Sequence, residues 1–299
     1  MDVSIIIVNF NTIFLLINAV DSVFNKTESI EYEIIVVDNN SSDNSKKIIL
    51  ERYGDKVIYL ALPENIGFGR ANNEAVKIAK GRNLFFLNPD TILINNAVKI
   101  LSDFLDMNPH VGCCGGNLFS LEGSPNYSFS RKRVLSIFNE MDEIFYYIPS
   151  KLIFGKNYSF NHTNEPIKVC CIIGADLMIK NSIFNKLNGF DNDFFMYHEE
   201  AELEHRVSKM GLEMRCVPNA KIIHLEGKSI TNNLNKLRWL CYSRKLYLQK
   251  THNLIEISIV NILVCLKIIS RILFFFFYGN KTKERYWLNM YRLTFQGTT

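Results

Sequence analysis

Two carboxylates stand where buried strands are expected to end. Asp38 follows a β-branched run, and Asp90 follows the strand-like stretch Leu84–Leu87 within Asn88-Pro89-Asp90-Thr91. Because Pro89 fixes its own φ and has no N–H to donate, strand pairing should stop there and the Asp90 side chain should point beyond the sheet edge. This position suits a divalent cation, whereas the tetrapeptide by itself is more typical of a turn that caps a following helix. A second acid on a neighbouring strand favours a binding site.

A dense group of acids occurs later, in FDNDFFMYHEEAELEHR (residues 190–206). The pattern predicts a polar helix over residues 199–210, which carries Glu199, Glu200, Glu202 and Glu204. Helical geometry cannot place all four on one face. The helix dipole stabilises carboxylates in a first turn, and that alone could account for them. A catalytic role requires one of them to face the site as a general base.

A single histidine, His224, ends a short strand predicted over Lys221–His224. A lone histidine after a strand is more often structural. With Asp90 available, however, His224 becomes a candidate second metal ligand. Oxygen ligands with one imidazole suit Mg²⁺ or Mn²⁺ better than zinc.

The stretch NIGFGRANNEA (residues 65–75) imitates a dinucleotide-binding fingerprint, since Gly67-Phe68-Gly69 precedes a helix. The third glycine position holds Asn72, and two predicted strands come before the motif, whereas the fingerprint normally opens the first strand–helix–strand unit. A nicotinamide-dependent dehydrogenase is therefore disfavoured.

The elements that must position these residues alternate between strand and helix. Strands are predicted over residues 3–8, 33–37, 57–62 and 84–87, with helices over residues 13–24, 44–53 and 70–80 between them. Such alternation predicts a parallel sheet with helices on both faces, and ligands bind at the carboxyl ends of its strands. Residues 111–164 look like a looser insertion of loops and helices, and order returns from residue 169.

The C-terminal segment differs in charge and hydrophobicity. The net charge is +4, but residues 221–299 carry 13 Lys/Arg against 3 Asp/Glu, a balance of +10. A helix predicted over Ile255–Tyr278 places Glu256, Lys267, Ser270 and Arg271 on one face and apolar residues on the other. We expect this helix to lie in a membrane interface, with the basic stretch Lys236–Lys250 as an electrostatic anchor. A buried or dimer-forming helix is the alternative, and the apolar face argues against nucleic acid as a partner.

Seven motifs occur in order along roughly residues 2–230, and no single one of them is specific. They are SIIIVNFNT, EIIVVDNNSSDNS, NIGFGRANNEA, FFLNPDT, GADLMIK, NGFDNDFFMYHEEAELEHR and HLEGKS. Together they resemble the family 2 inverting glycosyltransferases, in particular the rhamnosyltransferase-like and galactofuranosyltransferase-like enzymes of bacterial surface polysaccharide synthesis. The resemblance implies a GT-A-type α/β/α sandwich with a mostly parallel sheet, here followed by C-terminal amphipathic helices.

The resemblance also implies roles in binding. Contacts to the nucleotide base and ribose fall on Asn9, Asn11, Asp38 and Asn40, and the rest of the nucleotide pocket falls on Asn65, Gly67 and Asn72. Asn88-Pro89-Asp90 stands where the family has an Asp-x-Asp metal motif. Asp90 and His224 would therefore hold Mg²⁺ or Mn²⁺, with Asn88 as a supporting contact.

The catalytic base implied by the resemblance is Glu200, the second acid of the family's Glu-Asp-x-Asp pattern. Glutamates replace both aspartates of that pattern, at Glu200 and Glu202, and Glu199 is a reserve candidate. The longer side chains leave the assignment of the base open among these three.

The expected function is inverting transfer of one sugar, from dTDP-rhamnose or a UDP-hexose, to a lipid-linked oligosaccharide at the cytoplasmic face of the inner membrane. The expected division is a catalytic domain over residues 1–230 and membrane-associating helices over residues 231–299. Within the first, residues 1–110 would bind nucleotide and residues 111–230 would carry the acceptor and catalytic half. A homodimer is a further expectation, and an inactive nucleotide-sugar-binding or scaffold protein is the alternative.

Overall fold

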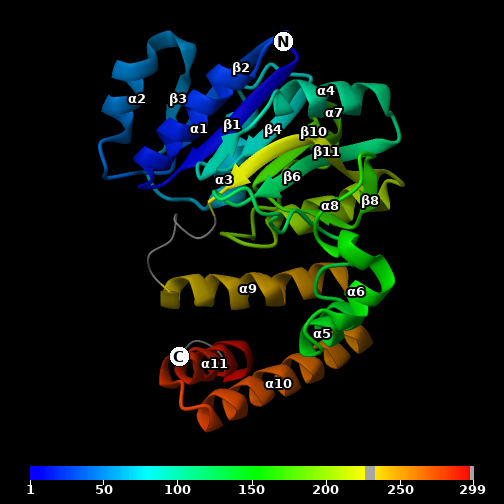
Figure 1. Ribbon diagram of the computed structural model, residues 1–299. Helices are drawn as coiled ribbons and strands as arrows, with labels where there is room; N and C mark the ends of the chain where they lie inside the picture. Colours follow the sequence, from blue (N-terminus) through cyan, green and yellow to red (C-terminus); the bar gives the residue numbers. More distant parts are fainter. Residues whose placement is uncertain (226–232, 297–299) are drawn as a thin grey trace.

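The computed structural model describes residues 1–225 and 233–296, and its first half has the predicted alternation (Figure 1). The elements are β1 (Val3–Asn9), α1 (Ile13–Lys26), β2 (Tyr32–Asp38), α2 (Ser45–Tyr53), η1 (Gly54–Lys56), β3 (Ile58–Ala61), α3 (Phe68–Val76) and β4 (Asn83–Leu87). Every residue of β1 and β4 is buried, as expected for strands with helices on both faces.

The second half completes the sheet and adds short helices. Its elements are β5 (Thr91–Leu93), α4 (Ala97–Met107), β6 (Val111–Phe119), β7 (Phe129–Ser130), α5 (Ile137–Ile144), α6 (Ile148–Phe154), η2 (Gly155–Tyr158), β8 (Ile167–Val169), β9 (Cys171–Ile172), β10 (Asp176–Lys180), α7 (Asn181–Lys186), α8 (Glu199–Lys209) and β11 (Glu213–His224). The main sheet has the order β3-β2-β1-β4-β10-β6-β11-β5, with β8 paired to β11. Among the described strands, β10, β5 and β8 run against the other six, so the sheet is mostly parallel, as predicted.

The prediction of a loose region over residues 111–164 is wrong at its start, because Val111–Phe119 is a central strand between β10 and β11. Its sequence, VGCCGGNLF, is poor in the β-branched residues that mark strands. The small residues are required by packing, since a Cβ on Gly116 would clash with the Ala220 carbonyl of β11. The helical part of the predicted insertion is confirmed by α5 and α6.

The two faces of the sheet bury different side chains of the same strands. In β1, Val3, Ile5 and Ile7 pack toward α1, α2 and α4, whereas Ile6 and Val8 pack toward α3, α7 and α8. This alternation follows from the two-residue period of a strand.

Three further helices, α9 (Asn233–Thr251), α10 (Leu254–Phe277) and α11 (Lys281–Tyr291), and the η3 turn (Arg292–Gln296) lie below the α/β part in Figure 1. Apolar residues of α8, α9 and α10 form a third buried cluster, which includes Ala201, Tyr247 and Val264. Helices α9 and α10 therefore pack onto the α/β part, and α11 packs against α10.

The charged face of α10 packs against α5. Lys267 Nζ lies 2.6 Å from a Glu140 carboxylate oxygen and 2.8 Å from one of Glu143, both on α5. The Arg271 guanidinium lies 4.0 Å from the centre of the Tyr146 ring. This face thus turns toward α5, because its charges find partners there, and the exposed side chains of α10 are mainly apolar.

Candidate active site

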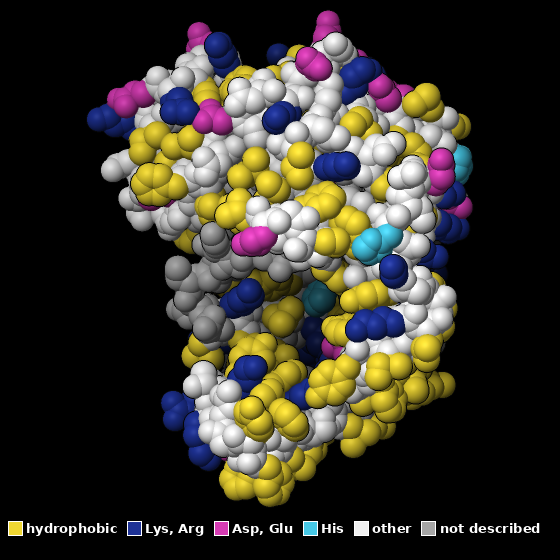
Figure 2. Space-filling model, viewed as in Figure 1, with side chains coloured by type: hydrophobic (Ala, Val, Ile, Leu, Met, Phe, Trp, Pro, Cys, Tyr) yellow, Lys and Arg dark blue, Asp and Glu magenta, His cyan; other side chains and the backbone are white. Residues whose placement is uncertain are grey.

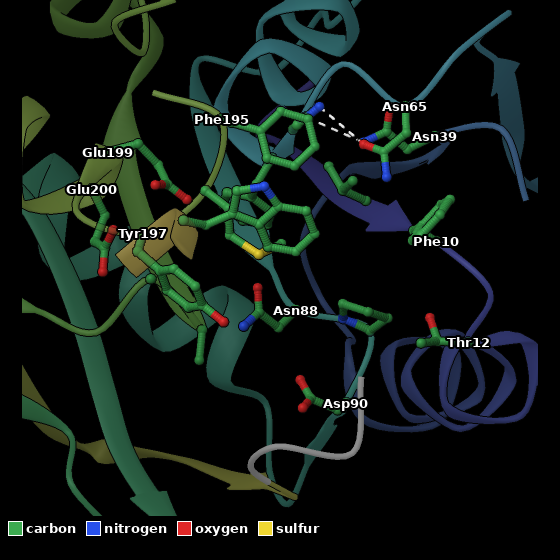
Figure 3. Close-up of a pocket in the computed structure, with 18 of the residues that line it drawn as sticks. Phe10, Thr12, Asn39, Asn65, Asn88, Asp90, Phe195, Tyr197, Glu199 and Glu200 are labelled. Carbon is green, nitrogen blue, oxygen red and sulfur yellow. Dashed lines mark hydrogen bonds between the residues drawn. The ribbon is translucent and has the colours of Figure 1, made fainter. Parts of the chain in front are cut away.

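A cavity of about 510 Å³ opens at the carboxyl edge of the sheet (Figure 3). Its lining combines asparagines and aromatic residues from strand ends with acids from the start of α8. The lining residues are Val8, Phe10, Asn11, Thr12, Asn39, Asn65, Gly67, Phe68, Asn88, Pro89, Asp90, Ile173, Gly174, Ala175, Phe195, Met196, Tyr197, Glu199, Glu200, Asn235 and Trp239. Figure 3 shows Glu199 and Glu200 on one side and Phe10, Thr12, Asn39 and Asn65 on the other.

The ends of β1 and β2 are joined by a buried polar network. Asn9 Nδ2 donates to Asp38 Oδ1 (3.1 Å) and to the Ser45 hydroxyl (2.9 Å). Both Asn9 and Asp38 are buried and neither lines the cavity. Their predicted contact with nucleotide stays a prediction, and the hydrogen bonds that the structure gives them join the ends of β1 and β2. Asn11 does line the cavity.

Asn39, which sequence reasoning missed, lines the cavity in place of the predicted Asn40. Asn39 Nδ2 donates to Asn65 Oδ1 (2.9 Å), and Asn39 Oδ1 accepts from the Ile66 N–H (2.9 Å). Asn40 is exposed outside the cavity because its positive φ of 65° turns the chain away. Two asparagines, Asn39 and Asn40, follow Asp38 in the sequence. Side chains along a strand alternate between its two faces, but this alternation did not show which of the two asparagines faces the cavity.

Gly67 lines the cavity as predicted. The absence of a side chain at this position allows another backbone segment of the protein to approach it closely. A Cβ at this position would clash with the Phe195 carbonyl, which accepts a hydrogen bond from the Phe68 N–H (2.9 Å). Asn72, in contrast, does not line the cavity: it is buried in α3, and its Nδ2 donates to the Phe68 carbonyl (3.0 Å). The glycine thus brings the 195 loop against the start of α3.

Asp90 and His224 are brought together by strand pairing. The chain turns at Asn88-Pro89-Asp90 and continues as β5, so the alternative of a helix cap at this turn is wrong. Thr91 pairs with His224 of β11, which places His224 Nε2 3.5 Å from Asp90 Oδ1. Asp90 lines the cavity, as does Asn88.

The Asp90–His224 pair has the donors that a hard divalent cation takes. Only 3% of Asp90 is exposed, and this residue is part of the cavity lining. His224 Nδ1 is buried and has no hydrogen-bond partner among residues 1–225 and 233–296, which is unusual for an imidazole with no further role. Within residues 1–225 and 233–296 the pair belongs to no group of three or more metal-ligating side chains. A cation here would take its remaining ligands from water and substrate oxygens.

The acids at the start of α8 follow two residues in the left-handed region, Tyr197 (φ 72°) and His198 (φ 67°). Such backbone strain in non-glycine residues concentrates at functional sites. Burial and the neighbouring Glu200 raise the pKa of Glu199 well above its usual value, and Glu199 Oε2 has no hydrogen-bond partner. Burial also raises the pKa of Glu200, while backbone N–H groups of the first helical turn act in the opposite direction.

Glu202 lies outside the cavity. Its carboxylate accepts from Arg206 Nε (2.8 Å) and Nη2 (2.6 Å), and Arg206 also donates to the Leu187 and Gly189 carbonyls. This pair anchors α8 to the turn before it. Glu202 is therefore unsuited to act as the catalytic base. Glu199 and Glu200 remain as the candidates for that role.

Helix α9 supplies part of the cavity wall, which sequence reasoning missed. Asn235 and Trp239 line the cavity, and the Trp239 ring lies 5.0 Å from the Phe195 ring. The Ser243 hydroxyl donates to the Met196 carbonyl (2.7 Å), so α9 also holds the loop before α8. A basic composition gave no signal for this role. The domain boundary predicted at residue 230 and residues 226–229 of the HLEGKS motif lie outside the described residues.

This α/β fold is that of the GT-A glycosyltransferases. A solved structure described as GalNAc-T7 with UDP, GalNAc and Mn2+ matches with a TM-score of 0.56 and 19% identity, covering 80% of this chain and 47% of that chain. Residues 4–187 match Glycosyl transferase family 2, and the chain belongs to this family.

Several curated proteins are similar in sequence. O-antigen biosynthesis protein RfbC of Myxococcus xanthus is 27% identical over 72% of this chain, and the match spans only 16% of RfbC. N-acetylglucosaminyl-diphospho-decaprenol L-rhamnosyltransferase of Mycobacterium tuberculosis is 25% identical over 66% of this chain and 67% of that protein. Rhamnosyltransferase WbbL of Escherichia coli K12 is 26% identical over 73% of this chain and 83% of WbbL.

Proposed function

We propose that this chain transfers one sugar, with inversion, from a nucleoside-diphosphate sugar to a hydroxyl of a lipid-linked oligosaccharide in bacterial surface polysaccharide synthesis. The observation that carries the proposal is that Asp90, beside His224, and Glu200 line one cavity at the carboxyl edge of a GT-A sheet. The names of the similar rhamnosyltransferases favour dTDP-rhamnose as donor, with a UDP-hexose as the second choice.

Asp90 and His224 would hold the Mg²⁺ or Mn²⁺ ion, supported by Asn88. When bound, such an ion supplies positive charge that stabilises the departing nucleoside diphosphate. Asn11, Asn39 and Asn65 line the opposite part of the cavity and present amide groups suited to a nucleotide base and ribose. Asn9 and Asp38 hold the loops that carry them.

Glu200 is the proposed base. Glu199 is the more deeply buried of the two acids, and burial together with the neighbouring Glu200 raises its pKa well above the usual value. This direction makes Glu199 the acid of the pair that favours its protonated form and Glu200 the one that favours the negative charge. The Glu200 carboxylate removes the proton of the acceptor hydroxyl, and the oxygen attacks the anomeric carbon opposite the leaving group. A single displacement of this kind inverts the configuration.

A nucleotide-sugar screen by thermal unfolding tests the proposed function. We expect one nucleotide, in the presence of Mn²⁺, to raise the Tm of the full chain by about 5 °C at 100 times its Kd. Omission of Mn²⁺ should reduce that shift, because the diphosphate loses its cation. No shift with any nucleotide sugar would contradict the proposal, and binding without transfer to any acceptor would favour the inactive scaffold.

We further propose that the chain is peripheral at the cytoplasmic face of the membrane. Among the described residues, α10 is the one helix long and apolar enough to cross a membrane by length and composition. The pairing of Lys267 with Glu140 and Glu143 supports a helix that lies along the surface, since it ties the middle of α10 to the charged helix α5. Ile262, Leu266 and Leu273 share an exposed face of α10.

Replacing Ile262, Leu266 and Leu273 by glutamine should lower binding to vesicles that contain phosphatidylglycerol by at least about ten-fold, because apolar area is lost from the interface. Flotation of the full chain measures this. The matched control replaces Phe14, Met107 and Leu121 by glutamine; these residues are apolar and at least as exposed, and they lie on the α/β part. Unchanged flotation of the α10 variant would contradict the membrane assignment. A variant that still floats but no longer forms a dimer would contradict it as well.

A further inference from the structure

A second cavity of about 350 Å³ lies between α9, the first half of α10 and the η3 turn. Its described lining contains three cationic residues and no acid. The lining residues are Arg238, Cys241, Tyr242, Arg244, Lys245, Leu248, Gln249, Ile257, Asn261, Leu293, Thr294 and Phe295. In the space-filling view the molecule is hollowed between the layer of α9 and that of α10 and α11, with Lys and Arg side chains near the opening (Figure 2). The composition of this lining is suited to an anion.

Arg244 is the most informative member of the lining, because only 9% of it is exposed. Its Nη1 donates to Asn261 Oδ1 (3.3 Å), whereas its Nη2 is buried and has no hydrogen-bond partner in the described part of the chain. Burial lowers the pKa of Arg244, and the carboxylates of Glu140 and Glu143 oppose that effect. Both of these acids already accept from Lys267. A buried guanidinium with an N–H group that lacks an acceptor lowers the stability of the fold, and an anion that accepts from this N–H group would remove that cost.

Arg238 and Lys245 are exposed at the same cavity and form no ion pair with any carboxylate of residues 1–225 and 233–296. Some other cations of α9 to α11 are paired. Lys250 lies 2.8 Å from Asp191, and Lys281 lies 3.1 Å from Glu284. The cavity therefore places two exposed cations that have no carboxylate partner among the described residues beside the buried Arg244.

The position of the cavity relates it to the candidate active site. Trp239 of α9 lines the active-site cavity, and Lys245 of the same helix lines the cationic cavity. Six residues of α-helix separate them, a rise of about 9 Å. On the opposite side, the cationic cavity borders α10, whose exposed face is apolar. An anion bound here would lie between the reacting sugar and an apolar surface.

We propose that this cationic cavity binds the phosphate groups that join the acceptor glycan to its lipid, with Arg238, Arg244 and Lys245 as the charged contacts. The inference rests on the proposed function, because it assumes an acceptor that carries phosphate between sugar and lipid. Phosphate groups so held would direct the glycan past Trp239 toward Glu200 and the lipid along α10. The same chemistry would recognise the phosphate of an anionic phospholipid, so the experiment must separate the two sources.

The test compares Arg238→Gln/Lys245→Gln with a matched control, Lys283→Gln/Arg285→Gln, which removes two exposed cations of α11 outside the cavity. The first measurement is calorimetric binding of inorganic diphosphate to the full chain without divalent metal. We expect the cavity variant to bind about ten-fold or more weakly, because two charged contacts are lost, and the control to bind as the unmodified chain does. This measurement does not depend on sugar transfer, so it tests whether the cavity binds phosphate groups even if the proposed function fails. Equal binding by the cavity variant and the control would overturn the proposal.

The second measurement is transfer to a short-chain prenyl-diphosphate-linked sugar and to the same sugar on a phosphate-free alkyl chain. The cavity variant should show a KM about ten-fold or more higher for the first acceptor, with an unchanged KM for the donor and for the second acceptor. Equal losses with both acceptors would contradict a role in phosphate binding. A loss confined to flotation on phosphatidylglycerol vesicles, with an unchanged acceptor KM, would assign the cavity to phospholipid and overturn the acceptor proposal.

Discussion

Replacing Glu200 by glutamine is expected to lower kcat for sugar transfer by about 10²- to 10⁴-fold, the usual contribution of a general base. The amide keeps the shape of the side chain but cannot accept the proton of the acceptor hydroxyl. Because Glu200 lies on the side of the cavity away from Asn39 and Asn65, nucleotide binding should persist (Figure 3). Steady-state transfer assays and nucleotide-induced thermal shifts measure the two effects separately.

The neighbouring acid supplies the comparison for this variant. Glu199→Gln should reduce kcat far less, because burial raises the pKa of Glu199 and so favours its protonated form, which an amide resembles. Glu200 works as a carboxylate, so transfer should fall as pH drops through its raised pKa, and Glu200→Gln should lose that acidic limb. If Glu199→Gln proved the more damaging change, the base would be Glu199.

Replacing Asp90 by asparagine is expected to lower kcat/KM by about 10³-fold, a loss of roughly 4 kcal/mol of transition-state stabilisation. The amide is a weaker ligand than the carboxylate, so the Mn²⁺-dependent part of the nucleotide thermal shift should also disappear. Titration of activity with Mn²⁺ measures the weakened metal affinity.

The matched control for Asp90 is Asp55→Asn, at an exposed position away from the cavity. It should leave activity and metal dependence unchanged. Asp90 is buried, so circular dichroism and the Tm must show that the Asp90→Asn variant is folded. If a folded Asp90→Asn variant kept full activity and an undiminished response to Mn²⁺, the proposed role of Asp90 as a metal ligand would be contradicted.

Much of the fold could be predicted from the sequence because its first half follows simple periodicity. The strands β1, β2 and β4 are buried on both sides and rich in β-branched or aromatic residues. The central strand β6 was missed because its position depends on glycines that fit against β11, a requirement that appears only when both strands are in place.

The candidate site was predicted in part for the same reason. Asp90 was expected just after a predicted strand and Glu200 in the first turn of a predicted helix, and both line the cavity. The contact of Asp90 with His224 depends on antiparallel pairing of β5 with β11, across more than a hundred residues of sequence. Local patterns carry no information about such pairing.

Two features of the site needed the structure itself. Strand register, not residue type, decides that Asn39 lines the cavity and Asn40 does not. Trp239 enters the site because α9 packs on the loop before α8, and its basic, weakly patterned sequence predicted a membrane anchor. Both cases depend on tertiary contacts.

The most direct test of the central claim is transfer by the purified full chain from each nucleotide sugar to a lipid-linked acceptor, with the anomeric configuration of the product determined by NMR. We predict one preferred donor, a requirement for Mg²⁺ or Mn²⁺, and a new linkage whose configuration is inverted relative to the donor. A product of retained configuration, full transfer in the presence of EDTA, or nucleotide-sugar binding without any transfer would contradict it.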